Sequence, residues 1–338
     1  MLHKFFRKDP LILVPYRTYG TPQHLYVLGR ALEDKKLKID QKQSIFRTIK
    51  NTYKQLESDE IRFADIELEV SEDLPKIHFQ ANSEGYFKVD KNFDNDFSTM
   101  ADDEGWMSYF LSFAEHLTDR EIENGNVFQG EVLIPPKTAK FGVISDIDDT
   151  ILETGVTSFV KWRVLHNTIF KNVYDRIPLE GASDFYTKLH SGIEENQNPV
   201  FYLSNSPWNL YQYLKLFLDS NNFPKGPILL RNIKTPFDRT KKAEKPHKQK
   251  EILNILKTYP GLNFILIGDS GEHDPGIYTD IAAQFPDRIL AIYLRSVKHK
   301  KKMERVQAIV DNYRTVPVLL VNKSEEAAEH AQNMKWIK

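Results

Sequence analysis

Three carboxylates crowd into four positions of the chain, at Asp146, Asp148 and Asp149. They follow the apolar, β-branched residues 141–144, which predict a short buried strand. A strand that ends in clustered acid is typical of a parallel sheet whose carboxyl edge faces a binding site. In an extended backbone Asp146 and Asp148 point to the same side. Their repulsion costs free energy unless a cation neutralises it or one group stays protonated. The stretch therefore indicates either a functional site or a polar turn, where Asp is common.

Two later strands also end at polar side chains. Residues 200–203 lead into Ser204 and Asn205, and residues 264–267 lead into Asp269. A helix predicted near residue 247 places Lys248 in its first turn, where the helix dipole disfavours a cation. A residue that breaks a local rule at the end of an element invites a functional explanation. Because the carboxyl ends of parallel strands share one edge of a sheet, we expect these side chains to converge.

The chemistry of this set is that of phosphoryl hydrolysis. Asp carboxylates on neighbouring strand ends suit Mg²⁺, which would offset the charge of an incoming phosphate. Ser204 and Lys248 can hold phosphate oxygens. A second carboxylate two residues from a nucleophile can protonate the leaving oxygen and then activate water. Asp274 precedes Pro275, a pair that fits a helix cap as well as a metal ligand.

The elements around these residues alternate between strand and helix, which predicts a parallel sheet over the second part of the chain. The predicted helices cover residues 160–173, 181–189, 208–218, a segment from about 247, 296–313 and 325–334. Before the helix over 208–218, Pro207 fits the first helical position, and Ser206 or Asn205 would cap the helix. The predicted strands cover residues 141–144, 200–203, 228–230, 264–267, 289–294 and 316–321.

The first part of the chain has a different pattern. Strands are predicted over residues 11–14, 25–32, 61–70, 77–89 with a turn at 82–85, 106–114 and 127–134, and one helix over 44–56. Gly20 and Pro22 are interpreted as breaks between strands. Short strands at close spacing predict a β-sandwich. Residues 135–138, with two prolines, mark the boundary, so we expect a β-sandwich accessory domain over 1–138 and a catalytic domain over 139–338.

Composition sets outer limits. The 338 residues carry 41% hydrophobic and 28% charged side chains and a formal net charge of −1, so nothing draws the chain as a whole towards nucleic acid. The absence of cysteine excludes disulfides, thiolate zinc sites and cysteine nucleophiles. No run approaches the ~20 apolar residues of a transmembrane helix, and the N-terminus lacks the apolar segment of a signal peptide. We expect a cytoplasmic protein that can be peripheral at membranes.

Four motifs occur in the order of the haloacid-dehalogenase-like phosphohydrolases: DIDDT, a strand-terminal Ser, a helix-opening Lys and GDSGEHD. More narrowly, SDIDDTI with TGV, YLSNSPWNLY, FPKGPILLR, HK, and FILIGDSGEHDPGIY with IYLR resemble the catalytic domain of the actin-patch-protein type of phosphatidate phosphatase. The resemblance runs from residue 141 to at least 295. It implies a Rossmann-like three-layer α/β domain with a minimal cap, and the β-sandwich ahead of it is similar to the bacterial members.

The resemblance also implies a role for each matching position. Asp146 would be the nucleophile that forms an aspartyl-phosphate, and Asp148 the general acid and base. Thr150, Ser204, Asn205 and Lys248 would shape the loop and bind the phosphoryl group. Mg²⁺ would be held by the Asp146 carboxylate, the Asp148 backbone carbonyl and Asp269, with Asp274 supporting the site from behind.

The spacing of the motifs bears on the substrate. Asp146 and Ser204 are 58 positions apart (204 − 146), and Ser204 and Lys248 are 44 apart (248 − 204). Neither gap leaves room for a large cap domain, and an open site suits a phosphate carried on something large. We expect phosphatidate or a similar lipid phosphate, with basic residues 161–171, 234–250 and 298–302 as either a lipid-facing or a solvated surface. The alternatives are the same chemistry on a phosphoprotein or soluble phosphoester, or a non-catalytic module whose β-sandwich binds a protein partner.

Overall fold

The computed structural model describes residues 9–34, 59–114, 120–151, 179–231, 245–271, 273–296 and 300–338. The chain divides into two compact units, Met1–Ile134 and Pro135–Lys338. The predicted helices over 44–56 and 160–173 lie outside the described residues, as do residues 234–244 of the lysine-rich loop and the side chains of the basic run 298–302. None of the helices in the described part of the chain is long and apolar enough to cross a bilayer.

In the described residues of the first unit, eight strands form one hydrogen-bonded sheet. The strands are β1 (Leu11–Pro15), β2 (Thr18–Thr21), β3 (His24–Glu33), β4 (Asp65–Glu69), β5 (Ile77–Gln80), β6 (Tyr86–Asn92), β7 (Trp106–Phe113) and β8 (Phe128–Leu133). They lie in the order β1-β3-β2-β8-β7-β4-β5, and β6 pairs with β3. Side chains along β3 alternate between buried and half-buried, which is the pattern of strands with one face towards a core. The division into two stacked sheets stays a prediction.

The interpretation of Gly20 as a break between strands is wrong, because Gly20 lies inside β2. Thr21 pairs with His24 across the connection to β3. A Cβ atom on Gly20 would lie 2.3 Å from the His24 carbonyl oxygen. Glycine is therefore needed here for close approach of the two backbones, a role that glycine also takes within strands.

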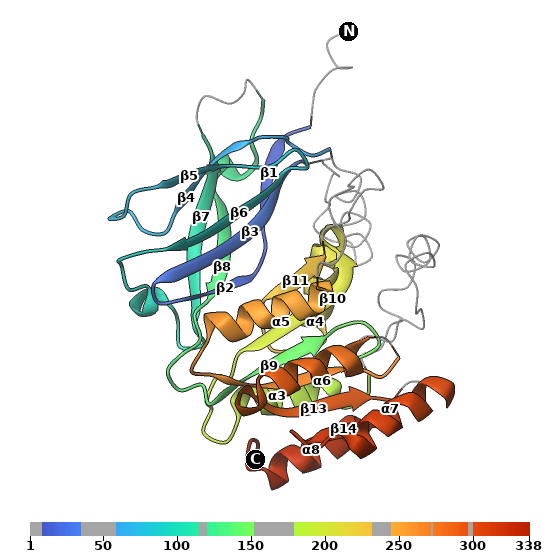
Figure 1. Cartoon of the computed structure of the whole chain (residues 1–338). Helices are drawn as coiled ribbons and strands as arrows, with labels where there is room; N and C mark the ends of the chain where they lie inside the picture. The colour runs from blue at the N-terminus through green and yellow to red at the C-terminus, as the bar shows by residue number, and fades with distance from the viewer. Residues whose placement is uncertain are drawn as a thin grey trace. The chain divides into compact units, whose positions relative to one another are not determined.

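The second unit contains a six-stranded parallel sheet in the order β11-β10-β9-β12-β13-β14 (Figure 1). Its strands are β9 (Phe141–Asp146), β10 (Val200–Pro207), β11 (Ile228–Arg231), β12 (Asn263–Asp269), β13 (Ile289–Arg295) and β14 (Val318–Val321). The helices are α3 (Ala182–Ser191), α4 (Tyr211–Ser220), α5 (His247–Thr258), α6 (Asp274–Gln284), α7 (Lys300–Asn312) and α8 (Ser324–Asn333). The predicted α/β class with a parallel sheet is confirmed for this unit.

The connections decide where a site can form. From β9 the chain moves outwards to β10 and β11, and then returns past β9 to β12 on its other side. Right-handed crossovers place helices of these two directions on opposite faces of the sheet. In agreement, α3 packs with α8, and α5 packs with α6. The reversal occurs between β9 and β12, and the carboxyl ends of the strands at such a switch point form a crevice.

Arg288 fastens two of the elements that frame this crevice. It lies in the short 3-10 helix Pro286–Arg288, and its Nη2 donates to the carbonyl oxygens of Tyr259 at 2.6 Å and Leu262 at 2.7 Å. These carbonyls lie between the end of α5 and the start of β12. The guanidinium thus ties the connection between α5 and β12 to the 3-10 helix.

We expect Arg288→Met to lower the free energy of unfolding by about 1.5–3 kcal/mol, because charged hydrogen bonds to half-buried carbonyls are lost. Thermal or urea unfolding followed by circular dichroism measures the change. Arg314→Met is the matched control, since Arg314 also donates to two carbonyls at a helix end but is exposed. Equal stability of the two variants would contradict the assignment.

Candidate active site

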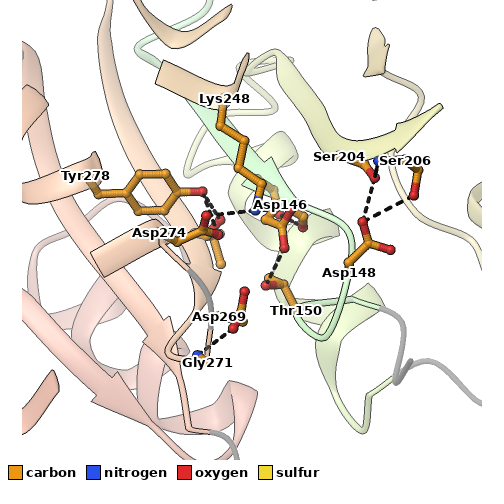
Figure 2. Close-up of polar contacts among 12 residues, drawn as sticks. Asp146, Asp148, Thr150, Ser204, Ser206, Lys248, Asp269, Gly271, Asp274 and Tyr278 are labelled. Carbon is orange, nitrogen blue, oxygen red and sulfur yellow. Dashed lines mark hydrogen bonds and ion pairs between the residues drawn. The ribbon is translucent and has the colours of Figure 1, made fainter. Parts of the chain in front are cut away.

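Asp146 lies at the carboxyl end of β9, and its side chain is fully buried. The strand pairs on one side with β10 and on the other with β12. The next amide, that of Ile147, donates to the Leu203 carbonyl at 3.0 Å and so extends the pairing beyond the strand. Asp146 therefore projects from the centre of the sheet, between the ends of β10 and β12 (Figure 2).

Lys248 connects Asp146 with a second carboxylate. Its Nζ atom lies 2.8 Å from Asp146 Oδ1 and 2.7 Å from Asp274 Oδ1, and the lysine is only 2% exposed. In the sequence, Lys248 stood out because a cation is unfavourable in the first turn of a helix. The structure shows that two buried carboxylates offset this unfavourable position.

Asp274 does not cap its helix, so that alternative from the sequence is wrong. It is the first residue of α6, after the N-cap residue His273, and the helix has no side-chain cap. Its Oδ2 instead lies 3.4 Å from the hydroxyl of Tyr278, which also donates to the Ile267 carbonyl at 3.1 Å (Figure 2). A Cβ atom on Gly268 would lie 2.5 Å from Asp274 Oδ2. Glycine at this position leaves room for the carboxylate.

Asp269 ends β12 and completes a group of three buried carboxylates. Its Oδ1 accepts a 2.5 Å hydrogen bond from the amide of Gly271. Within the described residues, carboxylate oxygens of Asp146, Asp269 and Asp274 lie within 4.8 Å of one another. Three carboxylates against one lysine leave an excess of two negative charges if all are ionised. Such an excess is unfavourable in a buried site and fits a divalent cation with oxygen ligands.

Asp148 belongs to a second, neighbouring group. Its Oδ2 accepts from Ser204 Oγ at 2.5 Å and from Ser206 Oγ at 3.4 Å, while the Ser206 amide donates to Ser204 Oγ at 2.8 Å. The carboxylate of Asp148 thus faces β10, and it is not among the three that could share an ion. The predicted metal role of Asp148 concerns its backbone carbonyl and stays a prediction.

Residues 204–207 form more strand than the sequence predicts. β10 extends to Pro207, whose backbone is extended, and a 3-10 helix, Trp208–Leu210, precedes α4. The predicted cap by Ser206 or Asn205 is wrong, since neither helix has a side-chain cap. The Ser206 hydroxyl is directed to Asp148 instead. The repeated Ser of the Ser-Asn-Ser sequence was the signal for a second hydroxyl at this carboxylate.

Thr150 is buried beside a carboxylate, whereas Asn205 is exposed. Thr150 Oγ1 donates to Asp146 Oδ2 at 3.3 Å, and the residue is buried. Asp149, between Asp146 and Thr150 in the sequence, adopts a left-handed backbone with φ of 55°. Asp tolerates this conformation better than most residues. The side chain of Asn205 is exposed. Tyr278, which supports Asp274, was not singled out from the sequence, because its spacing on α6 is equally that of a core residue.

The electrostatics follow from burial. Burial raises the pKa of Asp146 well above its usual value; Lys248 opposes this shift, and the carboxylates of Asp274, Asp148 and Asp269 add to it. Compared with the unfolded chain, the folded protein without a cation therefore holds the proton of Asp146 to higher pH. This contribution to stability is complete below the unfolded pKa and is lost as the pH rises through the folded one.

Comparison with known proteins places the site within a recognisable segment. Residues 141–296 match the family model for the catalytic domain of phosphatidate phosphatase APP1. A segment of 155 residues is 41% identical to the phosphatidate phosphatase APP1 of Saccharomyces cerevisiae, and one of 157 residues is 33% identical to an uncharacterized protein of Schizosaccharomyces pombe. Each match covers 46% of this chain and 25% of the relative, so the chain spans about a quarter of the length of these relatives.

Among solved structures, a carbohydrate acetylesterase from Xanthomonas citri aligns with 93% of this chain and 68% of its own. The sequences are 11% identical and the TM-score is 0.29. A likeness of this size carries no argument about fold or activity.

We expect a divalent cation to raise the melting temperature of the protein, because it neutralises the excess charge of the carboxylate group. Asp269→Asn should abolish most of this shift while keeping the acceptor for the Gly271 amide. Thermal unfolding with and without Mg²⁺ measures it. Asp280→Asn, an exposed change on α6, is the control, and an equal Mg²⁺ shift in both variants would exclude the site.

Cation binding should also release protons, because the ion and the proton compete for Asp146. The affinity for Mg²⁺ should therefore rise with pH through the raised pKa of this carboxyl group. Calorimetric titration in buffers of different ionisation enthalpy counts the protons released. An affinity that is independent of pH between 5 and 8 would contradict the raised pKa.

Proposed function

We propose that the protein is a phosphatase that hydrolyses phosphomonoesters, because residues 141–296 match the family model for the catalytic domain of phosphatidate phosphatase APP1. The observation that carries the proposal is the buried contact of Asp146 with Lys248 at the switch point of a parallel sheet, with Asp148 two residues further on. A nucleophile, a cation and a proton donor are thereby within one site.

In the first half of the reaction Asp146 is the nucleophile. A carboxylate oxygen bonds to phosphorus, and the bond from phosphorus to the leaving alkoxide oxygen breaks, which yields an aspartyl-phosphate. Asp148 gives the leaving oxygen its proton. Ser204 and Ser206 both donate to Oδ2 of Asp148, and this assigns the transferable proton to Oδ1.

In the second half Asp148 acts as the base. It takes a proton from a water molecule, whose oxygen bonds to phosphorus while the bond from phosphorus to Asp146 breaks. Inorganic phosphate leaves and the Asp146 carboxylate is restored. The hydroxyl of Thr150, already on Oδ2 of Asp146, holds the orientation of the nucleophile through both halves.

The transferring phosphoryl group needs donors for its oxygens. Lys248 supplies a point charge beside the nucleophile, and Asn205 supplies a donor from the end of β10. Ser204 supplies a second donor when its hydroxyl turns from Asp148 to the phosphoryl group, and Ser206 then keeps its contact with Asp148. Asn205 is exposed in the free protein, which suits a residue that meets the substrate rather than the core.

The carboxylates fit Mg²⁺ as the cofactor. Asp146 and Asp269 would hold the ion together with the Asp148 backbone carbonyl, and Asp274 would support them through Lys248. When bound, the ion offsets the charge of the phosphate so that an anionic nucleophile can approach it.

The proposed substrate is phosphatidate or a similar lipid phosphate at a membrane surface, in line with the name of the yeast relative. The strand order and the site support a haloacid-dehalogenase-like domain. The short spacing of the motifs supports a minimal cap, which would leave the crevice open to a large substrate. The eight-stranded first unit would be a β-sandwich accessory domain that presents a surface to a protein partner.

We expect Asp146→Asn to lower phosphate release by about three orders of magnitude or more, because the shape is kept and the nucleophile is lost. Asp149→Asn is the matched control: the same change three residues on, at a left-handed position that Asn also tolerates. Phosphate release from phosphatidate in mixed micelles measures both variants. A folded Asp146→Asn protein that remains active would remove the nucleophile from the mechanism.

The substrate class is tested with wild-type protein on a panel with and without Mg²⁺. Micellar phosphatidate, lysophosphatidate, glycerol-3-phosphate, p-nitrophenyl phosphate and a phosphopeptide cover the alternatives. Preference for micellar phosphatidate supports the lipid substrate. Release from soluble esters alone keeps the chemistry and refutes that substrate, whereas no release from any compound with Mg²⁺ bound favours a non-catalytic module.

A further inference from the structure

An uncharged pair of hydroxyls lies behind the nucleophile. Ser145 Oγ donates a 2.7 Å hydrogen bond to the backbone carbonyl of Asp146. The hydroxyl of Tyr186, on α3, lies 2.5 Å from the same Ser145 Oγ. Ser145 is fully buried and Tyr186 is 2% exposed. The mechanism above uses neither residue.

The direction of the protons in this pair can be assigned. A carbonyl only accepts, so the single proton of the Ser145 hydroxyl goes to Asp146. The proton between the two hydroxyls must then come from Tyr186. Burial raises the pKa of Tyr186 far above its usual value, so the phenol keeps the proton it donates. The series of hydrogen bonds therefore runs from Tyr186 to Ser145 to the Asp146 carbonyl.

We propose that Tyr186 and Ser145 are positioning residues for the phosphoryl transfer, which fix the peptide group between Asp146 and Ile147. The inference rests on the proposed function. The amide of this peptide is held by the Leu203 carbonyl at 3.0 Å, and its carbonyl is held by Ser145. Rotation of the peptide would turn both the Asp146 side chain and the backbone that leads to Asp148. Misplacement of reacting groups by about 1 Å can cost 10²-fold in rate.

Tyr186 is itself held in place by aromatic packing. Its ring stacks on that of Tyr202 with a centroid distance of 6.4 Å and an interplanar angle of 10°. Phe223 meets it edge-on at 5.5 Å. The hydroxyl therefore reaches Ser145 from a fixed ring, and the hydrogen bond transmits the position of α3 to the end of β9.

Tyr202 provides a matched control for the test. It is fully buried, stacks on Tyr186, and donates from its own hydroxyl to the Pro224 carbonyl at 2.8 Å. Tyr202→Phe and Tyr186→Phe thus remove the same atom from neighbouring buried rings. Only Tyr186→Phe interrupts the series of hydrogen bonds to Asp146.

We expect Tyr186→Phe to lower kcat about 10-fold with KM within twofold of wild type, and Tyr202→Phe to leave both within twofold. Ser145→Ala should lower kcat at least as much. Because the hydroxyls act in series, adding Tyr186→Phe to Ser145→Ala should change kcat by less than twofold. Additive losses, or equal kcat for the two tyrosine variants, would overturn the proposal.

Amide hydrogen exchange supplies a measurement that does not need turnover. The amides of Ile147 and Ile151 are both hydrogen-bonded, so a peptide over residues 146–151 should exchange faster in Tyr186→Phe than in Tyr202→Phe. Equal exchange would overturn the proposal. Wild-type protein that hydrolyses no phosphomonoester would refute the proposed function, and the exchange comparison would still decide whether Tyr186 orders this segment.

Discussion

The ion pairs of Lys248 are the contacts on which the site depends. A lysine that is 2% exposed lies between Asp146 and Asp274 at 2.8 and 2.7 Å, and desolvation of three such groups is tolerated only when each has a charged partner. Asp269 adds a third buried carboxylate. The ion pairs of Lys248 therefore hold α5 and α6 against β9. The three carboxylates together carry more negative charge than one lysine can neutralise. The fold tolerates this arrangement because the sheet fixes the positions of the carboxylates, and a bound cation or proton neutralises their excess negative charge.

The topology explains why these groups meet although they are distant in sequence. β9 is central, and the chain passes it again on the way from β11 to β12. Asp146 and Asp269 are thus the last residues of adjacent strands, while Lys248 and Asp274 open the two helices that flank β12. These four ionic groups therefore all lie at the ends of elements. A shift of one element along the sheet, such as loss of the Arg288 contacts would permit, separates charges that are stable only together.

Most strands and the convergence of the strand ends follow from the sequence, because a buried parallel strand is a continuous apolar run and its last residue is conspicuous when it is acidic. What the sequence could not predict are choices between equally good local partners. Asp274 before Pro275 suits a helix cap, yet its carboxylate binds Lys248, 26 residues away. Ser206 likewise suits a cap but donates to Asp148. Gly20 resembled a turn because close backbone approach and strand termination both require glycine. For Asp274 and Ser206, a contact that is distant in sequence overrides the local preference.

Asp146 is held from two sides by interactions of different kinds, and the difference suits what each atom must do. Its carboxylate, which must bond to phosphorus and be released again, is held by the ion pair with Lys248 and by the 3.3 Å contact with Thr150, both of which can rearrange as charge moves. Its backbone carbonyl, which takes no part in the chemistry, accepts from the neutral hydroxyl of Ser145, which in turn accepts from Tyr186. These hydrogen bonds join neutral groups, so they keep the same donors and acceptors when the charge at the carboxylate changes. The backbone can therefore stay fixed while the electrostatics of the side chain change around it, which is the condition for a nucleophile to react without a cost of reorganisation.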